Sequence, residues 1–310
     1  MSENMPSQTN DLDQNTSTRS VMFDVIVALC PAAIYGCILF GIKAAVVLAV
    51  SVGFAVTSEL IWNLLLKKKQ TVGDLTAIVT GLLLGMTLSA DTPPWIAAIG
   101  SIIAIIVVKQ MFGGLSHNFA NPVVVAKIIL LLSYPLQLLR FSEPISGQGN
   151  AVPPFIDGSN LTLKQLFFGM HSGNIGETIS FLLLIGGVYL ALRRIISPII
   201  PLTFIGIVAI LSIIFKENLA ITLFGGSLIL VAVFVATDPA TTPKQFFGKA
   251  IFGLGCGILC FIFEALLNVQ GGTFFAILIM NILTIFIDKI DFSKIKLPVF
   301  LKYKEVETNE

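Results

Sequence analysis

Long apolar runs, separated by short polar connections, make up most of this chain. A helix of about 20 apolar residues crosses the ~30 Å hydrocarbon layer of a bilayer, and most of the runs approach that length. The pattern predicts ten spans, at about 21–41, 43–66, 72–89, 94–110, 119–139, 174–192, 198–215, 218–236, 247–267 and 272–288. The third, fourth and last are short, so we expect them to be either less tilted or partly re-entrant.

Polar residues with helix-capping spacing mark several of these boundaries. Residues 71–74 (TVGD), 174–177 (NIGE) and 242–245 (TPKQ) resemble capping boxes and predict the starts of spans three, six and nine. Asn121 and Pro122 predict the start of span five in the same way. Capping is therefore the simplest role for the carboxylates in the first two of these stretches.

The composition favours a membrane protein. Of 310 residues, 55% are hydrophobic and 12% are charged, and the mean hydropathy is +0.91, whereas about a quarter of the residues in a soluble domain are charged. The net charge of +1 gives no indication of a nucleic-acid partner. Residues 1–20 are polar, so we expect a disordered tail, no cleaved signal peptide and a first apolar run that is retained as a span.

Lysine and arginine residues are distributed unequally between the two sides of the predicted bundle. With both termini inside, 14 of the 19 lysines and arginines lie in inner segments. The outer connections hold only Lys43, Arg140, Lys164 and Lys216. This positive-inside bias predicts two cytoplasmic termini, with a tail at 289–310, and an outward-facing connection at 140–173.

Two halves of the chain resemble each other weakly. The stretch 88–94 (LSADTPP) echoes 235–243 (VATDPATTP), and 112–122 (FGGLSHNFANP) echoes 270–281 (QGGTFFAILIMN). Because each half holds five spans, the halves must be inverted relative to each other. The predicted fold class is an all-α polytopic membrane protein of about ten helices in two inverted five-helix repeats, which usually place a binding region at their interface. The repeats would cover 21–139 and 174–288.

Several charged residues fall inside the predicted bundle, where each carboxylate costs at least ~2.5 kcal/mol. Glu59 and Glu264 face either a cation path or the membrane interface, and an intersubunit contact is a further option for Glu264. Asp24 is expected to favour the N-terminus of span one. Lys127 either snorkels towards the interface or pairs with a carboxylate or phosphate.

All four cysteines also fall inside apolar runs. Buried cysteine behaves as a small hydrophobe, so inert thiols are the simplest interpretation. A metal or iron–sulfur site is the alternative, although no pair has the C-x-x-C spacing. The residues concerned are Cys30, Cys37, Cys256 and Cys260.

One long polar connection, 140–173, contains the stretch FIDGSNLTLKQLF at 155–167. Its Asp, Ser, Asn and Thr residues are either solvated filler or a place where a group is attached. His171, near the end of the connection, is expected to be solvated.

Six stretches, in order along the chain, together resemble one family. They are VGDLTAIVTGLLLGMTLSADTPPW, FGGLSHNFANPVVVAKIILLLSYP, GNIGETISFLLLIGGVYLALRR, PLTFIG, VATDPATTP and GGTFFAILIMN. In these stretches the chain is similar to the NqrB/RnfD membrane subunits of bacterial respiratory complexes, and its length resembles the RnfD branch. The resemblance implies ten transmembrane helices in the bacterial cytoplasmic (inner) membrane.

The resemblance also implies a cofactor. Members of the family hold FMN on a threonine through a phosphodiester, in a Ser-Gly-Ala-Thr motif, and the matching residues here are Ser159, Asn160, Leu161 and Thr162. Thr162 is thus implied as the flavin-bearing residue, with Ser159 beside it and a flavin transferase as a partner. A second, noncovalent flavin such as riboflavin is implied between the helices. A loop without flavin is the alternative, because Asn160 and Leu161 replace the family's Gly and Ala.

Further cofactor-binding candidates lie in the polar connections. Gly113 and Gly114 let a backbone or a ligand come close, although tight helix packing explains them equally well. Asn118 lies beside His117, which makes either a loop hydrogen bond or a contact with a flavin or quinone. Asp238 belongs either to a turn or to a polar mouth near a flavin or ion path.

The function implied by the resemblance is that of a membrane subunit in an ion-translocating electron transport complex. Such a subunit carries FMN, couples electron transfer to Na⁺ or H⁺ export and acts with iron–sulfur, flavin-bearing and other membrane subunits of an Rnf-type complex. The sequence has no nucleotide-phosphate loop or nicotinamide fingerprint, so we expect no catalysis by this chain alone. The alternatives are a small-solute channel or carrier on a urea-transporter-like bundle and a purely structural anchor.

Overall fold

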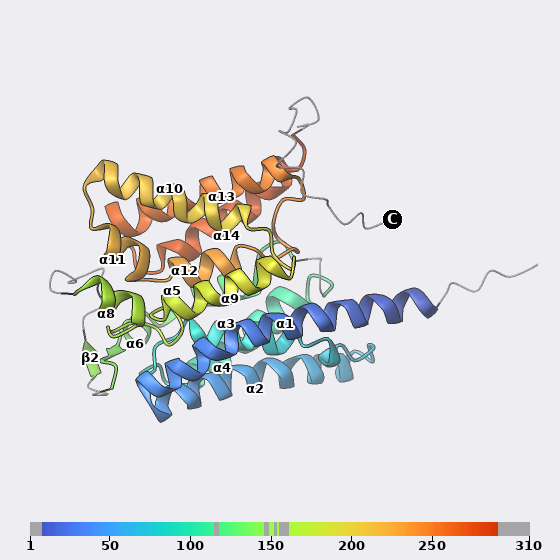
Figure 1. Ribbon diagram of the computed structural model, residues 1–310. Helices are drawn as coiled ribbons and strands as arrows, with labels where there is room; N and C mark the ends of the chain where they lie inside the picture. The colour runs from blue at the N-terminus through green and yellow to red at the C-terminus, as the bar shows by residue number, and fades with distance from the viewer. Residues whose placement is uncertain (1–7, 115–117, 146–148, 152–153, 155–160, 291–310) are drawn as a thin grey trace, which may run out of the picture.

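The computed structural model describes residues 8–114, 118–145, 149–151, 154 and 161–290, and these residues are mostly helical (Figure 1). The first half contains α1 (Gln8–Phe40), α2 (Ile42–Leu65), the 3₁₀-helix η1 (Val72–Asp74), α3 (Thr76–Met86), α4 (Pro94–Ile102), the π-helix η2 (Ile103–Gln110), α5 (Pro122–Ser133) and α6 (Pro135–Leu138).

The connection between the halves contains the short antiparallel strands β1 (Phe141–Ser142) and β2 (Gly149–Ala151) and the helix α8 (Leu163–Phe168). The second half contains α9 (Ser180–Leu192), α10 (Ile199–Phe215), α11 (Leu219–Phe224), α12 (Leu228–Leu230), the π-helix η3 (Val231–Val235), α13 (Phe246–Phe261), the π-helix η4 (Ile262–Leu266) and α14 (Gly272–Ile287). The start of α1 and the end of α14 lie at one end of the bundle, and α8 lies at the other (Figure 1).

Each half has its own helix packing, and helices of the two halves also pack against each other. In the first half α2 packs against α3 and α4, and in the second half α13 packs against α10 and α14. Between the halves, α1 contacts α9 and α5 contacts α14. At the α1–α9 contact Asp24 accepts hydrogen bonds from Tyr189 at 2.7 Å and from Arg193 at 2.9 Å. The expected role of Asp24 at a helix N-terminus is wrong, because it lies well inside α1.

The apolar helices are those of a multi-pass membrane protein. Among the described residues, three helical segments are long and apolar enough to cross a membrane: Thr18–Phe40, Ile42–Leu65 and Phe246–Leu266. Six shorter apolar helices accompany them. Large side chains such as Ile38, Leu65 and Ile213 are exposed on the outside of the bundle, where lipid chains would cover them.

Several helix boundaries differ from the expected ones. α1 begins at Gln8, so residues 8–20 of the expected tail are helical. The predicted capping boxes at 174–177 and 242–245 are wrong, because α9 begins at Ser180 and α13 at Phe246, neither with a side-chain cap. Span eight is interrupted between α11 and α12.

The predicted cap at Asn121 is present in the structure, whereas the capping box predicted at 71–74 is wrong. Asn121 caps α5, its Oδ1 accepting from the Val123 amide at 2.9 Å, and Pro122 is the first helical residue. Asp74 accepts from the amide of Thr76 at 2.8 Å and so supports the start of α3. The side chain of Thr71 does not cap η1.

The turn between α1 and α2 consists of a single residue, Gly41, with φ of 70°. A residue with a Cβ rarely adopts this conformation, so glycine is what allows two long helices to join here without a loop. The amide of Ala44 donates to the Gly41 carbonyl at 3.2 Å, which starts α2 immediately after the turn.

Small residues bring α2 and α3 into backbone contact. A Cβ placed on Gly81 would lie 2.7 Å from the Val52 Cα, and one on Gly85 would lie 3.2 Å from the Ser51 Cβ. The Ser51 hydroxyl also donates to the Gly81 carbonyl at 2.7 Å. Glycines four residues apart are a common device for close helix packing in membranes, where water does not drive helices together.

We therefore expect Gly81→Val to destabilise the protein by roughly 1–3 kcal/mol, because the new side chain has no room against α2. Gly53→Ala is the matched control, since no atom lies within 4 Å of a Cβ at that position on α2. It should leave the stability unchanged or raise it slightly. Thermal unfolding of the detergent-purified variants measures both effects, and equal stability of the two variants would contradict the packing described here.

Candidate functional site

A cavity of about 430 Å³ lies between α5, the connection before α9, α11 and η4. Its volume is in the range of small-molecule sites in proteins, about 300–1,000 Å³. Leu131, Phe141 and Phe274 contribute apolar walls, and the polar lining includes the following residues: Lys127, His171, Asn174, Glu177, Ser227 and Glu264. The cavity therefore combines apolar surface with a small set of charged groups.

Lys127 lies on α5, its side chain is only 3% exposed, and its ammonium group donates to the Thr87 carbonyl just beyond α3. The ammonium group also lies 5.9 Å from the centre of the Phe274 ring. The expectation that Lys127 snorkels is wrong, because the end of α3 provides a partner inside the bundle. A cation near a helix C-terminus is favourable, since the carbonyl end of a helix is negative.

The turn at residues 174–178 completes this junction with α3. The amide of Ile175 donates to the Leu88 carbonyl at 2.9 Å, and the amide of Gly176 donates to the Met86 carbonyl at 2.8 Å. A Cβ on Gly176 would lie 2.6 Å from the Met86 Cβ, so the turn can approach only without a side chain there. These bonds explain why the segment forms a buried turn rather than the first turn of a helix.

Asn174 and Glu177 leave two acceptors unused in the buried turn. The Asn174 amide donates to Glu177 Oε2 at 2.7 Å. Glu177 Oε1 and Asn174 Oδ1 have no hydrogen-bond partner among the described residues, although the two residues are only 6% and 9% exposed. A capping role for Glu177 is therefore wrong. Burying an acceptor without a hydrogen bond costs free energy, so a ligand that donates hydrogen bonds here would be favoured.

Glu264 is a second carboxylate of the cavity, on the π-helix η4. Its Oε1 accepts from the amide of Thr273 at 2.9 Å and from the hydroxyl of Thr273 at 2.7 Å, at the start of α14. The side chain thus lines the cavity and is bonded within the chain. Cys260 lies nearby and contacts the Thr273 hydroxyl at 3.2 Å. All four cysteines are free.

Thr162 is exposed and forms the N-cap of α8. Its hydroxyl accepts from the Gln165 backbone amide at 3.4 Å, and its own backbone amide donates to Gln165 Oε1 at 2.9 Å, which makes a capping box. The hydroxyl also donates to Gln165 Oε1 at 2.9 Å. α8 packs against α9 and α11, and both Pro154, which precedes this segment, and His171, which follows it, line the cavity. The hydroxyl that the resemblance singles out is therefore held by a helix that packs beside the cavity.

His171 lies in the connection between α8 and α9 and is buried, so the expectation that it is solvated is wrong. Burial lowers the pKa of its imidazole, and contacts with backbone groups such as Ser172 oppose that shift in part. Its Nδ1 lies 3.0 Å from the Ser172 carbonyl, and Nε2 has no partner among the described residues. A neutral ring that lines the cavity follows from this environment.

The remaining sequence candidates lie elsewhere in the structure. Gly113 and Gly114 follow η2 with φ of 111° and 94°, and Asn118 lies shortly before α5. Asp238 accepts from Asn121 Nδ2 at 3.0 Å and from the Ala240 amide at 3.1 Å, which confirms its place in a turn. None of the four candidate residues lines the cavity. Two further candidates, Ser159 and His117, lie outside the described residues.

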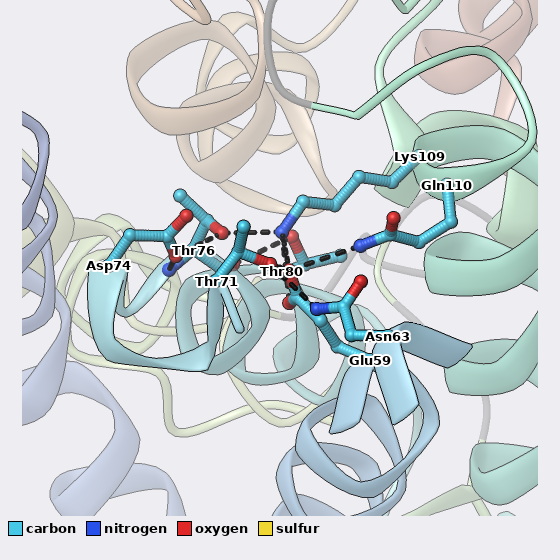
Figure 2. A network of polar contacts seen from close by, with 8 residues as sticks. All are labelled: Glu59, Asn63, Thr71, Asp74, Thr76, Thr80, Lys109 and Gln110. Atoms are coloured by element: carbon cyan, nitrogen blue, oxygen red, sulfur yellow. Dashed lines mark hydrogen bonds and ion pairs between the residues drawn. The ribbon is translucent and has the colours of Figure 1, made fainter. Parts of the chain in front are cut away.

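A second buried polar cluster lies between α2, α3 and η2, and Figure 2 shows the side chains converging on Glu59. The Lys109 ammonium donates to both carboxylate oxygens of Glu59, at 2.9 and 3.0 Å, and to the Thr76 hydroxyl. Thr71 and Gln110 also donate to Glu59, and Asn63 donates to Thr71.

This cluster gives Glu59 a partner that the sequence did not predict. The sequence places Glu59 either in a cation path or at the membrane interface, but the side chain is fully buried and its charge is balanced by Lys109, which is 3% exposed. No local pattern pairs these two residues, because they lie 50 positions apart. The only available signal is that both are charged within apolar runs.

Comparisons with known proteins identify relatives that match most of the chain. The model of the NQR2, RnfD, RnfE family matches residues 7–295. In Acetobacterium woodii, the subunit designated D of a Na(+)-translocating ferredoxin:NAD(+) oxidoreductase complex is 36% identical over 282 residues, which cover 88% of this chain and 89% of the relative. The corresponding subunit of a proton-translocating ferredoxin:NAD(+) oxidoreductase complex from Clostridium ljungdahlii is 34% identical, with 88% and 90% covered. That of an ion-translocating oxidoreductase complex from Stutzerimonas stutzeri is 30% identical, with 89% and 91% covered.

The buried pair of Glu59 and Lys109 leads to a stability prediction. Lys109→Met leaves Glu59 as an uncompensated buried carboxylate and should cost about 3–5 kcal/mol, and the double variant Glu59→Gln/Lys109→Met should recover much of that loss. Unfolding of the detergent-purified proteins measures the differences.

Lys43→Met is the matched control for this experiment. Lys43 pairs with Asp91 at 2.8 Å, but its side chain is 56% exposed, so the loss should stay within about 1 kcal/mol. Similar losses for Lys43→Met and Lys109→Met, or no recovery in the double variant, would contradict the role given to the buried pair.

Proposed function

The chain belongs to the NQR2, RnfD, RnfE family, and from that premise we propose that it is a membrane subunit of an ion-translocating oxidoreductase complex. In this proposal the chain does not catalyse the reaction alone, because the electron donor and acceptor bind to other subunits. Relatives are named for Na⁺ and for protons, so the proposal covers either exported cation. The localisation we propose is the bacterial cytoplasmic (inner) membrane.

We further propose that the chain carries FMN, attached to Thr162 through a phosphodiester. The observation that supports this most directly is the position of Thr162, an exposed hydroxyl on a helix that packs beside a partly apolar cavity. An exposed hydroxyl is accessible to a flavin transferase. The phosphate and ribityl chain of FMN would lie between that hydroxyl and the cavity.

The cavity residues fit the ring of a flavin. The volume of about 430 Å³, the apolar walls and the unused acceptors of Asn174 and Glu177 together match a flat ring with one polar edge. FMN would supply electron transfer, and the chain would supply binding, orientation and charge. Attachment would keep the flavin at a high effective concentration beside its redox partners.

The proposal includes two inverted repeats. Two features support this arrangement. Each half contains a helix that is continued by a π-helix, α4 with η2 and α13 with η4, and each of these two π-helices is followed by a connection with a glycine of positive φ. The helix after each connection, α5 or α14, then contacts the other half. With both termini in the cytoplasm, α8 lies on the external face.

The attachment of FMN predicts a specific mass. The peptide that contains Thr162 should carry the mass of FMN when the chain is produced with its partner subunits and a flavin transferase, and the denatured protein should fluoresce in a gel. Thr162→Asn should abolish both signals, because asparagine preserves the helix cap but offers no hydroxyl. Thr57→Asn, the same change at an exposed threonine on α2, is the matched control and should keep both signals. Retention of FMN in Thr162→Asn would place the attachment elsewhere.

The orientation predicts which exposed residues can be labelled from outside. Cysteine introduced at Lys164, beside Thr162 on α8, should react with a membrane-impermeant maleimide added to intact cells. Cysteine at Lys67, after α2, should react only once the membrane is opened. Both native residues are exposed, so accessibility within the protein does not differ between them. The reverse pattern would overturn the orientation, and labelling of both cysteines from the same side would contradict the proposed topology.

A further inference from the structure

We propose that Lys127 and the buried turn with Asn174 and Glu177 bind the imide edge of an isoalloxazine ring. This inference rests on the proposed presence of FMN and goes beyond it, because it assigns the ring's orientation and the residues that set its electron affinity. The imide edge presents an acceptor, a donor and an acceptor in a row: the C2 carbonyl, the N3–H and the C4 carbonyl.

The turn provides the acceptors for N3–H. Glu177 Oε1 and Asn174 Oδ1 are unpartnered among the described residues, and both side chains line the cavity. Backbone hydrogen bonds from the amides of Ile175 and Gly176 to carbonyls at the end of α3 hold this turn in place. A carboxylate held in a buried turn without a full set of partners needs a donor from a ligand.

Lys127 provides the donor for a ring carbonyl. Its ammonium group has three donor positions, and the structure shows one hydrogen bond, to the Thr87 carbonyl. Although Lys127 and Glu177 line the same cavity, no ion pair joins them within 4.0 Å in the described part of the chain. The Lys127 ammonium can therefore donate to a ring carbonyl, and the Glu177 carboxylate can accept from N3–H. Together they complement the imide edge, which is neutral and carries two acceptors and one donor.

A bound cation is the less favoured occupant of this cavity. Lys127 already places a positive charge there, and Glu264 is satisfied by Thr273. No group of three or more His, Cys, Asp or Glu side chains suited to a metal ion is found in the described residues. The apolar walls formed by Leu131, Phe141 and Phe274 favour a flat organic ring.

The two charges should shift the flavin's reduction potential in opposite directions. Reduction adds electron density to the ring, and a cation at a ring carbonyl stabilises that density. Lys127→Met should therefore lower the midpoint potential of the attached flavin. Glu177→Gln keeps the shape and an acceptor but removes a negative charge, so it should raise the potential.

The first experiment measures these potentials by spectroelectrochemical titration of the assembled complex. Lys164→Met is the matched control, because Lys164 is an exposed lysine on α8 that does not line the cavity, and it should leave the potential unchanged. Shifts of the same sign in Lys127→Met and Glu177→Gln, or no shift in either, would overturn the inference. A wild-type complex that contains no covalent flavin would instead overturn the proposed function.

The second experiment does not depend on replacing the buried charges. In a complex with Thr162→Asn the cavity is open to added flavin, and quenching of flavin fluorescence reports binding. Riboflavin should bind, whereas riboflavin methylated at N3 should bind at least about tenfold more weakly, because it cannot donate to the turn. Equal affinities, or no binding of riboflavin, would overturn the proposed orientation of the ring.

Discussion

A helix that ends inside a membrane protein must find partners for its last carbonyl groups, and the structure of this chain depends on how α3 meets that requirement. The hydrocarbon offers no hydrogen bonds, so each exposed carbonyl would cost several kcal/mol. The carbonyls of Met86, Thr87 and Leu88 accept from Gly176, Lys127 and Ile175. These donors come from α5 and from the turn before α9, so one junction joins the two halves and builds the floor of the cavity.

The sequence predicted the helices better than their ends. Apolar runs are a strong signal for buried or lipid-facing helices, and the cap at Asn121 could be recognised because its partner is only two residues away. The start of α9 could not, because residues 174–177 look like a capping box but bond to α3, about 90 residues earlier. Local spacing carries no information about such a distant competitor. The burial of His171 escaped prediction for the same reason.

For the charged residues too, the sequence predicted part of the answer and the structure supplied the rest. The cost of a charge in a membrane predicted that Glu59, Lys127 and Glu264 would have particular roles, but it could not supply their partners. In the structure Glu59 is neutralised by Lys109, and Glu264 is bonded by Thr273. Lys127 and Glu177 remain only partly satisfied and line the same cavity. The difference between a structural pair and a binding site lies in this degree of satisfaction, which only the three-dimensional arrangement reveals.

The hydroxyl at the start of α8 serves its own helix before any group is attached to it. Besides accepting from the Gln165 amide in the capping box, Thr162 Oγ1 donates its proton to Gln165 Oε1 at 2.9 Å. In the proposed attachment, formation of an ester at this oxygen would remove that proton, and Gln165 Oε1 would keep only the Thr162 backbone amide, at 2.9 Å, as a donor. Chains with and without the flavin would then differ in the first turn of an exposed helix. A protein that binds this turn could therefore distinguish a subunit with attached flavin from one without it before the complex assembles.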